Sequence, residues 1–128
     1  MKIIALDIGG TAVKSGLVDN GVLKEHRETP TPAAEGGQAV VALAKKLIAA
    51  YLPEGADGIG ISTAGVVDSK SGSVLFAEDC IRGYTGIQVK ALLEDAFSLP
   101  TAVENDLNAA AVGEAASARA RAAKAFYA

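Results

Sequence analysis

The order of strand and helix signals along this chain predicts a mixed α/β sheet in a single domain. Three strand signals come first, and helix and strand signals then alternate, which gives the order strand, strand, strand, helix, strand, helix, strand, helix. Strands joined through helices run parallel, with right-handed crossovers. The 128 residues, half of them hydrophobic, are enough to bury one core. We therefore predict one domain over residues 1–128, with a five-stranded sheet that begins antiparallel and continues parallel.

The first three strands form a predicted antiparallel meander. Runs with a high β propensity occupy residues 2–8, 12–19 and 22–29, and the turn between the last two contains Asn20-Gly21. Asn-Gly is a strong signal for a tight hairpin turn. Pro30-Thr31-Pro32 then ends this part of the sheet.

The rest of the chain alternates between helices and strands. Apolar residues recur at helical spacing through residues 38–52 and predict an amphipathic helix, which Pro53 ends. A buried strand is predicted at 58–63, a loop and short hairpin at 66–77, a second helix at 88–97 and a short strand at 101–104. An alanine-rich helix is predicted to begin near Asp106.

Composition excludes several classes of protein. The net charge of −3 and the scattered basic residues give no general attraction for nucleic acid. Cys80 is the only cysteine and His26 the only histidine, so this chain has neither a disulfide framework nor a Cys/His zinc site. The start does not read as a signal peptide, and no segment reaches membrane-spanning length. We expect a cytoplasmic protein with no nucleic-acid or membrane partner.

A glycine motif lies between the first two strands, in Asp7-Ile8-Gly9-Gly10-Thr11. Gly9 and Gly10 fall where a tight turn favours positive φ and where a phosphate can approach the backbone. Asp7 can hold Mg²⁺ through water, and the Thr11 hydroxyl and amide can donate to phosphoryl oxygens. The motif predicts a nucleotide-phosphate site, although an ordinary Gly-Gly hairpin gives the same pattern. Strand alternation places Lys14 outward as a solvated residue, outside the predicted site.

Two polar clusters follow predicted parallel strands, where ligands collect in sheets of this kind. One contains Gly65, which has the simpler alternative of ending a strand, and the other contains Asn105 and Asp106. Both of these residues stand where a helix begins and can cap its free amides, but one cap is enough. The helix dipole keeps Asp106 ionised, as a proton acceptor requires. We favour catalysis over capping alone for Asp106, whereas Asn105 stays a closer choice.

Three motifs together resemble the ROK family of sugar kinases and related repressors, in the actin-like, ribonuclease-H-like ATPase superfamily. They are Asp-Ile-Gly-Gly-Thr at 7–11, Ser-Thr-Ala-Gly-Val-Val-Asp at 62–68 and Glu-Asn-Asp-Leu-Asn-Ala-Ala-Ala-Val-Gly-Glu at 104–114. The resemblance implies a ribonuclease-H-like lobe in which Asp7, Gly10 and Thr11 face the ATP phosphates and Mg²⁺. It also implies that Gly65, Asn105 and Asp106 face a sugar, with Asp106 as the catalytic base.

The chain departs from the family pattern in two ways. Cys80 stands where many glucose-phosphorylating members have a sugar-binding asparagine, and a thiol replaces an amide poorly. An N-acylhexosamine or a glycoside therefore joins a plain hexose as a candidate substrate. Members also run to roughly twice a single domain of about 100–150 residues. The chain thus resembles the N-terminal lobe only, and the family's zinc motif and further sugar-binding residues belong to the missing C-terminal lobe.

The predicted function is ATP-dependent phosphoryl transfer to a sugar hydroxyl, by an enzyme that is a homodimer when full length. The single lobe is expected to be inactive, because it cannot close a cleft around both substrates. A sugar-responsive ROK-type transcriptional regulator is one alternative, but it would carry a DNA-binding domain ahead of the glycine motif, which here begins at residue 7. A non-catalytic nucleotide- or sugar-binding module is another, and it has no need of the Asn105-Asp106 pair.

Overall fold

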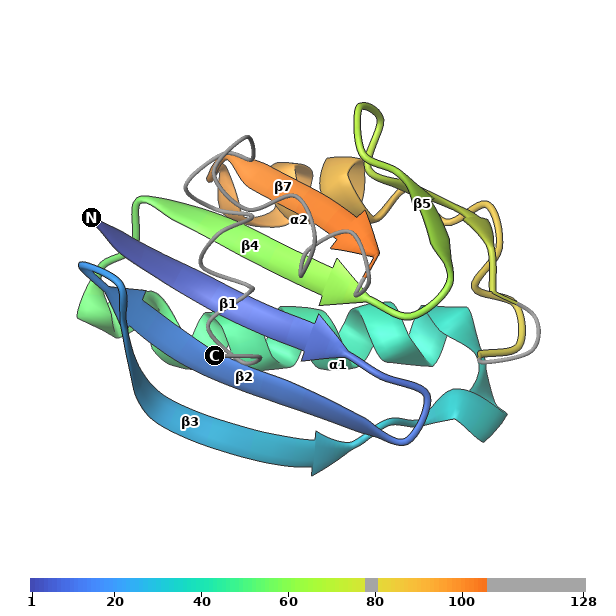
Figure 1. The fold of residues 1–128 in the computed structure, drawn as a ribbon, viewed down its shortest axis with the longest axis horizontal. Helices are drawn as coiled ribbons and strands as arrows, with labels where there is room; N and C mark the ends of the chain where they lie inside the picture. Colours follow the sequence, from blue (N-terminus) through green and yellow to red (C-terminus); the bar gives the residue numbers. More distant parts are fainter. Residues whose placement is uncertain (78–80, 106–128) are drawn as a thin grey trace.

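The computed structural model describes residues 1–77 and 81–105, which form a mixed five-stranded sheet in the order β3-β2-β1-β4-β7 (Figure 1). β1 (Lys2–Ile8) pairs antiparallel with β2 (Ala12–Asp19), and β2 pairs antiparallel with β3 (Val22–Pro30). β4 (Gly58–Thr63) and β7 (Thr101–Asn105) continue the sheet parallel to β1. The predicted sheet is confirmed, while the predicted last helix lies outside the described residues.

The β2–β3 turn has the backbone that its sequence predicts. Asn20 and Gly21 have φ angles of 51° and 85°. Positive φ at both central residues is the geometry of the hairpin turns that match the twist of a β-sheet. Asn and Gly adopt positive φ at low cost, and the tight hairpin turn predicted from Asn20-Gly21 is confirmed.

Helices α1 (Gly37–Tyr51) and α2 (Val89–Phe97) pack on one face of the sheet. Their apolar sides share a core with Ile4, Leu6 and Ile8 of β1. Because side chains alternate along a strand, the odd-numbered residues of β1 face the other way, where Ile3 and Ala5 form a second cluster with Val18. The same alternation places Asp7 on the face turned away from both helices.

α1 ends close to where the sequence predicts. The helix stops at Tyr51, and Leu52–Glu54 continues as a single 3-10 turn. Proline has no amide hydrogen to donate to the preceding turn, so Pro53 ends the α-helical pattern. None of the helices in the described ranges is both long enough and apolar enough to cross a membrane.

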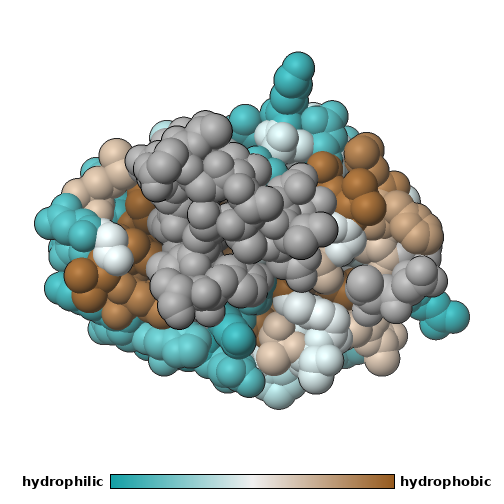
Figure 2. Space-filling model, in the orientation of Figure 1, coloured by the Kyte–Doolittle hydropathy of each residue, from teal (hydrophilic) through white to brown (hydrophobic). Residues whose placement is uncertain are grey.

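The predicted short hairpin is present as β5 (Val66–Asp68) and β6 (Ser73–Phe76). It projects beside β4 and β7, and its surface includes three exposed apolar side chains, Val66, Leu75 and Phe76. Figure 2 shows hydrophobic residues gathered over this part of the molecule. The hairpin therefore presents apolar side chains to solvent next to the end of β4.

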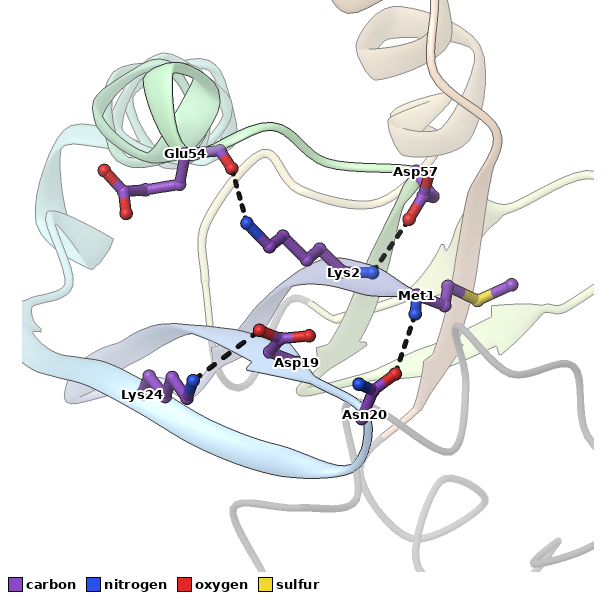
Figure 3. Close-up of polar contacts among 7 residues, drawn as sticks. All are labelled: Met1, Lys2, Asp19, Asn20, Lys24, Glu54 and Asp57. Carbon is purple, nitrogen blue, oxygen red and sulfur yellow. Dashed lines mark hydrogen bonds and ion pairs between the residues drawn. The ribbon is translucent and has the colours of Figure 1, made fainter.

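Polar contacts close the opposite edge of the sheet, where β1 begins (Figure 3). The Lys2 amide donates to Asp57 Oδ2 at 2.8 Å, and Lys2 Nζ donates to the Glu54 carbonyl at 3.0 Å. Exposed Lys24 and partly buried Asp19 form an ion pair at 3.5 Å. These groups bond to one another, so the contacts at this edge are explained by the structure of the lobe itself.

Candidate functional site

The three parallel strands end together at one edge of the sheet. Ile8, at the end of β1, pairs with Thr63 of β4, and Thr63 pairs with Asn105 of β7. The glycine loop follows Ile8, and Ala64-Gly65 follows Thr63. The carboxyl edge of parallel strands is where open α/β sheets bind ligands. The motifs at 7–11 and 62–68 thus lie at this edge, and the motif at 104–114 begins there, at the end of β7.

One row of polar residues crosses the sheet just inside that edge. Asp7 pairs with Lys14 on one side and with Ser62 on the other, and Ser62 pairs with Glu104. Residues that pair across neighbouring strands point to the same face. The row therefore presents an ammonium, two carboxylates and a hydroxyl on the face turned away from α1 and α2.

Burial differs along this polar row. Asp7 is 9% exposed and Ser62 is fully buried, whereas Lys14 and Glu104 are partly buried. Burial raises the pKa of the Glu104 carboxyl, because removing water disfavours its charged form. Lys14 is thus less solvated than strand alternation predicts, and its place opposite Asp7 makes it a site candidate, contrary to the prediction that it lies outside the site. The hairpin register alone could have identified it.

The glycine loop differs from its predicted backbone. Neither Gly9 nor Gly10 has a positive φ. The last pair of the hairpin is Ile8 with Val13, so the chain reverses its direction over four residues, 9–12. A loop of this length does not need the positive φ angles of a two-residue turn. The Gly9 amide donates to the Ala12 carbonyl at 3.0 Å, and a Cβ on Gly9 would lie 3.0 Å from the same oxygen. Close chain approach, and not positive φ, therefore explains Gly9.

Thr31 ties the glycine loop to the start of the next segment. Its hydroxyl donates to the Gly9 carbonyl at 2.7 Å, and its amide donates to the Thr11 carbonyl at 2.9 Å. Gly10 and Thr11 are exposed at the tip of the loop. A loop held at its base with an exposed tip can receive a ligand along its backbone.

Gly65 is required by the backbone. Its φ is +96°, and a Cβ would lie 2.7 Å from both the Ala77 Cβ and the Phe76 carbonyl oxygen. The preceding Ala64 amide donates to the Ile8 carbonyl at 2.7 Å, which joins the ends of β4 and β1. The backbone conformation at the end of β4 is therefore enough to explain a glycine at position 65. Contact between Gly65 and a sugar stays a prediction.

Tyr84 is buried beside the end of β4. Its hydroxyl lies 2.9 Å from Thr63 Oγ1, and both residues have no exposed surface. Burial raises the pKa of Tyr84 to about 12, and the hydrogen bond to Thr63 offsets part of that rise. The phenol is therefore neutral at physiological pH. No sequence pattern indicated this contact, because it joins residues from separate elements.

Several predicted residues cannot be placed in the site. Asp106 and Cys80 lie outside the described residues, and for Asn105 the structure gives the backbone position at the end of β7. Within residues 1–77 and 81–105, no group of three or more His, Cys, Asp or Glu side chains could hold a metal ion. Asp7, a buried carboxylate next to the Ser62 hydroxyl, suits an ion that keeps most of its water.

Comparisons with known proteins point to one family. The family model described as ROK family matches residues 3–128. A β-glucoside kinase of Listeria innocua is 37% identical over 117 residues, and the match covers 89% of this chain and 38% of the relative. An N-acetylmannosamine kinase of Citrobacter koseri is 33% identical over 116 residues, with 89% and 39% covered.

One of the similar solved structures resembles this chain in both sequence and fold. The ROK family glucokinase from Streptomyces griseus, determined in complex with glucose and AMPPNP, superposes with a TM-score of 0.76 at 36% identity. That match covers 89% of this chain and 36% of the glucokinase. The chain thus spans less than two-fifths of the length of each of these three proteins.

Proposed function

This chain belongs to the ROK family, and from that premise we propose that it is the N-terminal lobe of an ATP-dependent sugar kinase. The reaction transfers the γ-phosphoryl group of ATP to a hydroxyl of a hexose, an N-acylhexosamine or a glycoside. Relatives named for kinases of β-glucosides, glucose and N-acetylmannosamine support this reaction class.

The polar row at the carboxyl edge carries the proposal. Lys14, Asp7 and Ser62 lie in register across three neighbouring strands, next to the loop that holds Gly9, Gly10 and Thr11. An ammonium and the loop's exposed backbone suit phosphate oxygens, and the carboxylate suits a hydrated cation. An ordinary hairpin requires neither the buried carboxylate nor the lysine opposite it.

Asp7 is the residue that would hold Mg²⁺, through water. Mg²⁺ keeps several waters and binds through one or two carboxylates together with substrate phosphates. One buried carboxylate beside a hydroxyl fits that demand. When bound, the ion neutralises charge on the phosphoryl oxygens. The chain's own residues, Thr11 and Lys14, would orient the same phosphates.

Asp106 is the proposed catalytic base, with Asn105 and Gly65 on the sugar side. Asp106 accepts the proton of the sugar hydroxyl as its oxygen bonds to the γ-phosphorus, and the bond from that phosphorus to the bridging oxygen breaks to release ADP. Little covalent chemistry falls to the protein, so positioning and electrostatics dominate the catalysis. Its place directly after β7 supports this role, since β4 and β7 are neighbours in register.

The complete protein would supply what this chain lacks. We propose that the zinc ion that the family resemblance implies binds outside this chain, because the one cysteine and one histidine of this chain do not fit a zinc site. We propose that the full protein is a cytoplasmic homodimer that binds sugar and ATP. We also propose that the 128-residue chain alone has no kinase activity, because one lobe cannot enclose both substrates.

Steady-state kinetics on the complete protein test this function. ADP release would be followed with glucose, N-acetylmannosamine and β-glucosides, and each product identified by mass spectrometry. We expect phosphorylation of at least one sugar, with plain glucose a poor substrate because of Cys80. A protein that binds these sugars but releases no ADP with any of them would be a sugar-binding module and not a kinase.

A further inference from the structure

We infer that Tyr84 is a positioning residue for the candidate site, whose hydroxyl fixes Thr63 and thereby the turn that follows β4. The inference rests on the proposed function, in which that turn carries Gly65 on the sugar side. Tyr84 touches neither substrate in this account, and it acts through the strand end that it holds.

The hydrogen bonds around Thr63 run in one direction. The Thr63 hydroxyl donates to the Ala64 carbonyl at 3.3 Å. A hydroxyl has one hydrogen to donate, so the Tyr84 hydroxyl is the donor in the 2.9 Å bond to Thr63 Oγ1. Ala64 in turn donates its amide to the Ile8 carbonyl at 2.7 Å. Tyr84 is thus joined through Thr63 and Ala64 to the strand end that precedes the glycine loop.

Main-chain bonds hold the segment that carries Tyr84. The Tyr84 amide donates to the Ile81 carbonyl at 3.3 Å, the Ile81 amide to the Ala77 carbonyl at 2.8 Å, and the Ile87 amide to the Tyr84 carbonyl at 3.2 Å. The Ala77 amide also donates to Thr85 Oγ1 at 3.0 Å. A donor on such a segment can fix its partner because it has little freedom to move itself.

The start of helix α1 also contacts the segment that carries Tyr84. Its first residue, Gly37, donates its amide to the Arg82 carbonyl at 2.8 Å. A Cβ on Gly37 would lie 2.5 Å from the Gly83 carbonyl oxygen and 2.6 Å from the Tyr84 Cα, so the backbones already touch. Tyr84 is therefore held between the start of α1 and the end of β4.

The positioning role belongs to the Tyr84 hydroxyl and not to its ring, because the hydroxyl makes the bond to Thr63. Tyr84→Phe keeps the ring that fills the core and removes the bond to Thr63. A shift of about 1 Å in a positioned group can cost up to about 10²-fold in rate. We expect Tyr84→Phe in the complete protein to raise the sugar KM by roughly 10-fold, with the ATP KM changed less than about twofold.

Tyr51 provides a matched control. It is also a buried tyrosine, and its hydroxyl bonds to Ser15 Oγ at 3.2 Å and donates to the Glu25 carbonyl at 2.8 Å, at the other end of α1. Tyr51→Phe should lower the melting temperature by a similar amount and leave the sugar KM unchanged. Thr63→Val should raise the sugar KM as much as Tyr84→Phe does. Because both changes remove the same hydrogen bond, the double variant should have a sugar KM no higher than that of either single variant. Thr63→Ser keeps the hydroxyl and should have the wild-type sugar KM.

Amide hydrogen exchange tests the positioning independently of activity. In Tyr84→Phe, exchange should rise at residues 62–66, whereas in Tyr51→Phe it should rise near residues 15 and 25 instead. If the wild-type protein phosphorylates no sugar, the proposed function fails and the exchange result still decides the positioning. Unchanged exchange at 62–66, or a sugar KM that responds equally to Tyr51→Phe, would overturn the inference.

Discussion

Asp7 and Lys14 lie directly opposite each other in the β1–β2 hairpin, on the sheet face turned away from both helices. The pairing follows from the loop between them, because the last hairpin pair is Ile8 with Val13 and each earlier pair is then fixed. A carboxylate and an ammonium are thereby brought to the same end of the sheet. This relationship makes the glycine hairpin a candidate for binding both a cation and an anion.

Lys14→Met in the complete protein should weaken ATP binding. Hydrogen bonds to charged groups contribute about 1.5–3 kcal/mol, so the ATP KM should rise about 10- to 150-fold, with the sugar KM little changed. Lys24→Met is the control, because Lys24 is exposed and pairs with Asp19 near the opposite edge of the sheet. If both variants show the same ATP KM as the wild type, Lys14 does not contact the phosphates.

Asp106→Asn should separate catalysis from helix capping. Asn and Asp are nearly equivalent caps, so folding and the melting temperature should persist. A positioned base contributes about 10²–10⁴-fold, and that loss should fall on kcat while ATP affinity is nearly unchanged. Turnover like that of the wild type, with a small stability change, would assign Asp106 to capping alone.

Gly65→Ala should destabilise the protein more than Gly55→Ala. Both glycines have positive φ, at +96° and +78°, but a Cβ at Gly55 meets nothing within 4 Å. A side chain held at positive φ costs about 1–3 kcal/mol, which is the effect expected at Gly55. Gly65→Ala adds the contact with Ala77 and Phe76, so chemical denaturation should show a larger loss than at Gly55. Equal losses would mean that the β5–β6 hairpin yields to the added methyl group.

Glu104→Gln should raise stability at neutral pH and have little effect in acid. The folded state raises the pKa of this carboxyl, so folding takes up a proton between the unfolded and the folded pKa, and stability falls as the pH rises through that window. An amide has no charge to desolvate. Urea unfolding should therefore show the variant ahead at pH 7 and level with the wild type below about pH 4.3, where an ordinary glutamate is protonated.

Asp95→Asn is the control for this pH dependence, because it makes the same kind of change at a carboxylate that is exposed on α2. Comparing each variant with the wild type at each pH removes the contribution of the other carboxylates. A difference between Glu104→Gln and the wild type that does not change with pH would contradict the assignment.

Local signals were enough to predict most of the fold. The strands and helices follow from the spacing of apolar residues, and the turns follow from Asn-Gly and Pro53. Each of these signals depends only on residues that are close together in the sequence. The φ angles of Gly9 and Gly10 were predicted wrongly, since the loop length, which sets them, depends on the pairing register. The contact between Tyr84 and Thr63 was not foreseen at all, because it exists only once separate elements have packed.

The bond between the Gly37 amide and the Arg82 carbonyl fixes the backbone of an exposed segment to the start of α1. The segment from residue 81 to residue 87 owes its path largely to main-chain bonds with α1 and the β5–β6 hairpin, whereas the Arg82 side chain is exposed. Exposed side chains on a fixed backbone can be exchanged without moving that backbone. Single substitutions at the exposed positions of this segment should therefore change the surface of the lobe while its architecture stays intact.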